Sequence, residues 1–259
     1  MNHKIKNNNS KFFTRMSNKR IILLWNLIII NIIKFILSNE PNNFQATRNI
    51  IFLKITKNKN TKIISSGPFP DLIYVNGIQT EIDNSGYINI NDKEENNVTL
   101  IWNDTLKNCE YLFQNLDNII EIDLSKFNSS KVKSMNGMFY NCKKLQYINF
   151  GNIDTSSVTD MSSMFESCSS LLSMDLSNFN TSKVTDMSRM FLNCLSLTSL
   201  NISNLDTSKV LSIEKMFYLC KSLKSLDLNN FNVSKASNFK YLFFNCSSLK
   251  SLNLNNFNT

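Results

Sequence analysis

The chain has 259 residues with 28 basic and 20 acidic side chains, a formal net charge of +8, one histidine and five glycines. Seven basic and no acidic residues lie in residues 1–38, so the rest of the chain has 28 − 7 = 21 basic against 20 acidic side chains. This balance excludes a strongly basic, nucleic-acid-binding body, and the lack of histidine beyond His3 argues against acid–base catalysis.

Residues 1–38 are predicted to be an export segment. A basic stretch without acids precedes the apolar run Ile21–Leu37, which Asn26, Asn31 and Lys34 interrupt, and Ser38 follows it. This order is typical of a secretory signal peptide that is cleaved after Ser38. The alternative is an uncleaved signal-anchor, for which a run of seventeen residues is short. Both alternatives predict a secreted or cell-surface protein, which is membrane-anchored if the segment is retained.

Residues 39–105 are predicted to hold a polar linker and a small β-rich N-terminal cap. Short strands are expected between turn clusters rich in Asn, Asp, Ser and Gly, at Ile50–Thr56, Lys62–Ser65, Leu72–Thr80, Tyr87–Asn91 and Val98–Asn103. A stack of repeats needs a cover for its first apolar face, and this unit is the candidate.

Residues 106–259 repeat with a period of twenty-six residues, in about six units. Two sets of residues that are expected to form the structural core mark the period: Cys142, Cys168, Cys194, Cys220 and Cys246, and Phe139, Phe165, Phe191, Phe217 and Phe243. A fixed period of this length predicts a solenoid in which each unit stacks on its neighbours.

Each unit is expected to contain a strand and a short helix. The third unit, Leu171–Ser196, opens with an L-x-x-L-x-L pattern that points Met174 and Leu176 inward. An apolar spacing typical of one helix face follows, at Val184, Met187, Met190, Phe191 and Cys194. The fold class is therefore expected to be α/β, a curved right-handed solenoid with helices outside a single parallel sheet. Its strands are expected to be centred on Ile122, Ile148, Met174, Leu200, Leu226 and Leu252.

The run at 174–194, Met-Asp-Leu-Ser-Asn-Phe-Asn-Thr-Ser-Lys-Val-Thr-Asp-Met-Ser-Arg-Met-Phe-Leu-Asn-Cys, resembles the BspA-type leucine-rich repeat. The resemblance covers roughly Leu112 to Thr259. It implies a leucine-rich-repeat-like solenoid, exposure at a cell surface, and a role in adhesion or in contact with host or matrix. The family offers no catalytic residues to transfer.

The cysteines are expected to be buried free thiols, with no metal and no cofactor. No C-x2-C pair accompanies them, and the single histidine, His3, lies in the leader. Equivalent cysteines of stacked units are too far apart, with parallel side chains, to form disulfides. Cys109 lies outside the phase of the cysteine column, so we expect it to be exposed.

Possible ligand-facing residues lie on the outward strand face: Asp123, Tyr147, Asn149, Asp175, Asn201, Asp227 and Asn253. This column is either a ladder for a cation or a sugar, or a solvated face with side-chain amide ladders, and the second interpretation is favoured. A second column, formed by Lys131, Lys183, Lys209 and Lys235, either attracts an anionic partner or keeps the surface soluble.

The sequence thus predicts a non-enzymatic binding or adhesion protein whose partner is an extracellular protein or a glycan. The alternative is a structural spacer or scaffold without a ligand of its own. The last unit contains a strand but no second half, which leaves Leu252 and Leu254 without cover. End-to-end self-association through this unit is therefore also expected.

Overall fold

The computed structural model describes residues 49–56, 60–90, 94–255 and 257. The predicted leader and most of the predicted linker lie outside this range. The chain separates into Met1–Ala46 and Thr47–Thr259, and the second unit is described below. Within the described residues, no helix is long and apolar enough to cross a membrane.

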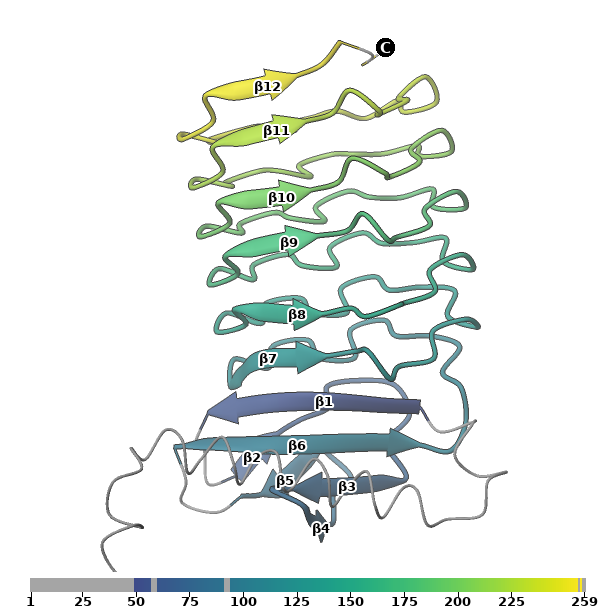
Figure 1. Ribbon diagram of the computed structural model, residues 1–259, viewed down its shortest axis with the longest axis vertical. Helices are drawn as coiled ribbons and strands as arrows, with labels where there is room; N and C mark the ends of the chain where they lie inside the picture. Colours follow the sequence, from purple (N-terminus) through teal and green to yellow (C-terminus); the bar gives the residue numbers. More distant parts are fainter. Residues whose placement is uncertain (1–48, 57–59, 91–93, 256, 258–259) are drawn as a thin grey trace, which may run out of the picture. The chain divides into compact units, whose positions relative to one another are not determined.

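The N-terminal part of this unit is built from antiparallel strands (Figure 1). They are β1 (Asn49–Thr56), β2 (Asn60–Lys62), β3 (Leu72–Val75), β4 (Ile78–Thr80), β5 (Tyr87–Asn89) and β6 (Glu95–Trp102). The range Leu72–Thr80, expected to be one strand, is a hairpin. Asn76 and Gly77 adopt φ angles of 51° and 83°, which suits a tight Asn-Gly turn between strands.

The repeats contribute one strand each, at the positions that the sequence predicts. These are β7 (Ile119–Asp123), β8 (Tyr147–Asn149), β9 (Ser173–Asp175), β10 (Ser199–Asn201), β11 (Ser225–Asp227) and β12 (Ser251–Asn253). Hydrogen-bonded pairs are parallel and exactly one period apart in register, as in Leu200↔Met174. The strands do not form the single sheet that was expected. They pair as β7–β8, β9–β10 and β11–β12, and the first pair joins the N-terminal strands in the order β4-β3-β6-β1-β7-β8.

The helix predicted over Val184–Cys194 is absent, and so are its equivalents in the other units that the structure describes. The segment is a series of tight turns in which two residues per unit have left-handed φ angles, for example Arg189 at 59° and Asn193 at 60°. An α-helix cannot pass through such residues. We call these segments, Asn108–Leu116 and its equivalents at steps of twenty-six, the turn runs. Coils are numbered one to six from here on, and each consists of one turn run and the strand that follows it, so that coil one holds Asn108–Leu116 and β7.

Alternate N–H groups of the first five turn runs point along the stack and replace helical hydrogen bonds. The N–H groups of Met187, Arg189 and Phe191 donate to carbonyls of the next coil at 3.1, 2.8 and 3.0 Å. The N–H of Met190 instead donates within the run, to Met187 O, at 3.3 Å. The apolar side chains at the predicted positions still point inward, because the series of turns directs the same residues to the core as a helix would.

The turn runs therefore bond each coil to the next through the backbone, whereas the strands do so only within the pairs β7–β8, β9–β10 and β11–β12. Isolated parallel bridges join the turn runs, from Ser134↔Asp160 to Ser212↔Asn238. The expected curvature rested on wide helices on one side and narrow strands on the other. That difference does not exist here, and Figure 1 shows the coils stacked one upon another.

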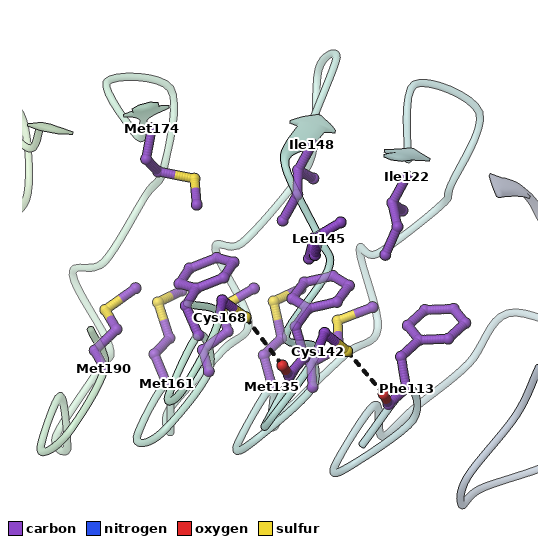
Figure 2. Packing of buried hydrophobic residues seen from close by; sticks show 14 of the residues in the cluster. Phe113, Ile122, Met135, Cys142, Leu145, Ile148, Met161, Cys168, Met174 and Met190 are labelled. Atoms are coloured by element: carbon purple, nitrogen blue, oxygen red, sulfur yellow. Dashed lines mark hydrogen bonds between the residues drawn. The ribbon is translucent and has the colours of Figure 1, made fainter. Parts of the chain in front are cut away.

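The core is a set of stacks in which side chains one period apart lie next to one another (Figure 2). Phe139, Phe165 and Phe191 lie nearly parallel, with ring centroids 5.6 Å apart at each step. The cysteine column is buried from Cys142 to Cys220, and all six cysteines are free. Cys109 is buried as well, contrary to expectation. It lies twenty-six residues before Met135, so it occupies the methionine position of the first coil.

The N-terminal strands cover the first coil. β1 runs antiparallel to β7 and aligns Leu53 with Ile122, and both side chains are buried. In the last coil, Leu252 and Leu254 are 36% and 40% exposed, whereas the equivalent Leu226 and Leu228 are buried. These leucine side chains are therefore buried only where a following coil covers them.

Candidate binding surface

The outward strand column lies on one side of the stack, as the sequence predicts. Asp175, Asn201 and Asp227 are exposed, and Tyr147 is 56% exposed. Inward-pointing Met174 lies between exposed Ser173 and Asp175 on the same strand. The column is therefore most accessible in the third to fifth coils, whereas Asp123, Asn149 and Asn253 are half-buried.

Every Asp or Asn of this column also holds the corner of the coil at the end of its strand. The Asp175 Oδ1 accepts the Ser177 N–H at 2.9 Å, and the same bond recurs from Asp123 to Asn253 at 2.7–3.3 Å. Asx turns of this kind mimic a backbone turn. The Ser177 N–H, with the Ser177 hydroxyl and Asn201, lowers the pKa of Asp175 below its usual range.

A second column of Asp and Asn makes the next corner, five residues further on. The Oδ1 atoms of Asn128, Asp154, Asn180, Asp206 and Asn232 each accept the N–H two residues later. Behind this corner, a ladder of buried hydroxyls links the coils: Thr155 donates to Asn180 O, and Thr181 to Asp206 O, both at 2.9 Å. The corners thus use side chains that resemble ligand-binding residues.

The two corner columns alternate in charge, in opposite phase. The first reads Asp, Asn, Asp, Asn, Asp, Asn from coil one to six, and the second reads Asn, Asp, Asn, Asp, Asn. Neighbouring strands lie about 4.8 Å apart, so two carboxylates of one column are separated by about twice that distance. An amide lies between them, and the Asn201 Nδ2 donates to Asp175 Oδ1 at 3.0 Å.

This arrangement separates carboxylates, whereas a cation site would bring them together. Among the described residues, no three His, Cys, Asp or Glu side chains are grouped as metal ligands. The alternation gives each of the first five coils one carboxylate and one amide at these corners, and it avoids stacking like charges directly on each other. The column therefore has a structural use that leaves its binding role open.

The lysine column is exposed but mixed with carboxylates. Lys131, Lys183, Lys209 and Lys235 all lie on the surface beside the second corner. Asp154 lies close enough to Lys183 for the lysine to help lower its pKa, after the stronger effects of the Ser156 hydroxyl and N–H. The Lys209 ammonium acts on Asp206 in the same way. The row is therefore less cationic than the lysines alone suggest.

The thiols of the cysteine column face the interior, and their environment makes them unreactive. The Cys142 Sγ donates to Phe113 O of the preceding coil at 3.0 Å, and the Cys168 Sγ to Phe139 O at 3.1 Å (Figure 2). Burial raises the pKa of Cys142 to about 12 and that of Cys168 well above its ordinary value. A thiol in this environment is a poor nucleophile.

Aromatic side chains that the sequence did not predict as a surface feature gather on the outside of the turn runs. Tyr218 stacks on Phe244 at 4.9 Å, and Tyr241 lies edge-on to both rings at 6.3 and 5.9 Å. Tyr111 and Tyr140 form an edge contact at 6.4 Å in the first two coils. The sequence does contain a signal for this clustering, because these aromatic residues occupy only two positions of the twenty-six-residue period.

Comparison with known proteins gives one family. Residues 107–201 and 173–259 each match the model described as "Mycoplasma protein of unknown function, DUF285". The two overlapping matches together span residues 107–259, more than half of the chain, and agree with the repeat. No curated protein and no solved structure matches the chain.

Proposed function

The chain belongs to the DUF285 family, and from this premise we propose that it is a non-enzymatic binding or adhesion repeat protein of the cell surface or secreted fraction. Its partner is an extracellular protein or a glycan. The observation that carries the proposal is the repetition of one exposed strand face, coil after coil, which suits an extended ligand.

The proposal includes a finer description of the repeats as BspA-type, in a right-handed leucine-rich-repeat-like solenoid. The L-x-x-L-x-L strand pattern, the parallel one-period register and the buried cysteine and phenylalanine stacks support it. The turn run in place of a helix is compatible with a repeat whose outer side is not helical.

A non-enzymatic role is supported by what the reactive side chains do. The buried thiols have raised pKa values, and the carboxylates of the strand column accept backbone N–H groups at the corners. Groups that are used in this way are poorly placed for nucleophilic or acid–base work.

The test is binding of the full chain to arrays of glycans and matrix proteins. Tyr147→Ser is the informative variant, because the third to sixth coils carry serine at the equivalent position. Asp175→Asn removes a charge and keeps the corner acceptor, so it separates binding from folding. We expect saturable binding that Tyr147→Ser weakens about tenfold, since exposed tyrosines are frequent anchors of interfaces.

A structural spacer without its own ligand is the second candidate. The use of the Asp and Asn column in turns favours it, because that column needs no ligand to explain it. If the chain binds nothing on the arrays, or if neither Tyr147→Ser nor Asp175→Asn changes its binding, the result supports the spacer and counts against adhesion through the strand face.

A further inference from the structure

The outside of the turn runs carries two aromatic patches at opposite ends of the stack. The first, in coils one and two, contains Glu110, Tyr111 and Tyr140, and Tyr111 is 37% exposed. The second, in coils five and six, contains Lys215, Tyr218, Lys240, Tyr241 and Phe244. Tyr241 and Phe244 are 49% and 51% exposed.

The first patch has an acidic environment. Burial raises the pKa of Tyr111, and the carboxylates of Asp160, Glu110 and Glu166 raise it further. Glu166 is largely covered and accepts the Ser163 hydroxyl at 2.7 Å, so it contributes charge more than contact. Glu110 is exposed.

The second patch has a more basic environment. The Lys240 and Lys215 ammonium groups lie 5.2 and 5.7 Å from the Tyr241 ring centroid. Lys215 also pairs with Glu214 at 2.8 Å, whereas Lys240 is exposed. Exposed Arg189 lies in the adjoining fourth coil.

The two patches occupy the same positions of the repeat. Glu110 and Lys240 are five periods apart, and so are Tyr111 and Tyr241, while Tyr140 and Tyr218 are three periods apart. Consider two copies of this face related by a two-fold axis that lies across the stack, between coils three and four. The axis reverses the order of the coils, so coil one of each copy faces coil six of the other, and coil two faces coil five. That operation brings Glu110 opposite Lys240, Tyr111 opposite Tyr241, and Tyr140 opposite Tyr218.

We propose that the turn-run face binds a second copy of this chain in an antiparallel, two-fold symmetric dimer. Each contact then occurs twice, as in any isologous interface. Opposite charges set the register, and the rings supply the apolar contact area. The contacts come from two small patches of side chains, so the association is weak and reversible.

Sedimentation velocity of the purified full chain over a concentration series tests the proposal, with the same mild detergent in every sample. Wild-type protein is expected to dimerise reversibly, and less so at high salt. Glu110→Lys and Lys240→Glu each place like charges opposite one another twice, so each raises the dissociation constant about tenfold or more. An equimolar mixture of the two variants restores both ion pairs and is expected to dimerise as the wild type does.

Lys250→Glu, which changes an exposed lysine beside β12, is the matched control and is expected to leave dimerisation unchanged. Tyr241→Asn, a residue that tolerates the φ angle of 58° at this position, is expected to weaken the dimer without unfolding the chain. A wild-type monomer at all concentrations overturns the proposal. A mixture of the two variants that fails to associate also overturns it. Association that neither charge change affects, as expected for end-to-end contact through Leu252 and Leu254, overturns it as well.

Discussion

At the scale of single residues, the cysteines show how a polar group is accommodated in a repeated core. Each column thiol donates to the carbonyl of a phenylalanine in the preceding coil, at 3.0–3.2 Å. A buried donor that finds an acceptor avoids a desolvation penalty of about 1–3 kcal/mol. The cysteine column therefore fills the core and also links each coil to the preceding one by a hydrogen bond.

Stability should fall at alkaline pH because of these thiols. Burial raises the folded-state pKa of Cys109 and Cys142 from 9.0 to about 12, so the unfolded chain loses thiol protons first. Their contribution is fully present below about pH 9 and is lost as pH rises toward 12. Urea unfolding between pH 8 and 11 should show a steep decline. Cys194→Ala should reduce its slope by about 1.4 kcal/mol per pH unit, and an unchanged slope contradicts this account.

At the scale of elements, the turn run depends on residues that accept left-handed backbone angles. Such angles recur four residues apart in each run, as at Ser163 and Ser167 and at Lys215 and Leu219. The first coils use Asn115, Asn141 and Gly137 at these positions. Gly137 has a second reason to be glycine, because an added Cβ would lie 2.2 Å from the Tyr111 ring.

Asn193 tests the turn-run description against a helix. Its φ angle is 60°, so Asn193→Gly should change the free energy of unfolding by only a few tenths of a kcal/mol. Asn193→Val should cost about 1–2 kcal/mol, because a β-branched residue is strained there. Asn178→Val, on an exposed turn residue outside the left-handed region, is the control. In a helix, glycine would be the worse substitution at position 193, so that order of stabilities would refute the turn run.

At the scale of the whole molecule, the stack is a one-dimensional array in which the turn runs bond every coil to the next, while the strands bond only in pairs. The alternating Asp and Asn corners extend this order over two coils, and the strand pairs β7–β8, β9–β10 and β11–β12 follow the same two-coil step. In each of these pairs, the aspartate lies in the first strand and the asparagine in the second.

Export is the prediction that belongs to the chain as a whole. Residues 1–38 combine a basic stretch with an apolar run, and we expect them to direct the protein to the cell surface or the medium. Fractionation of cells that express the chain with and without these residues checks this. Loss of export on their removal is the expected result, and both forms in the cytosol would point instead to an intracellular scaffold. A size decrease of the exported form would separate cleavage after Ser38 from a retained anchor.

The sequence by itself determined the period, the strand positions of the repeats, the inward residues and the buried cysteine column from Cys142 to Cys220, because these depend on which side chains avoid water. It could not show that Val184–Cys194 is a turn run, because inward residues at helical spacing also fit alternating turns. Only the tertiary structure decided this, through backbone groups that find partners in the next coil. Tertiary stacking also decided the contact of Asn201 with Asp175 and the gathering of Tyr218, Tyr241 and Phe244, since neighbours one period apart meet only when the coils stack.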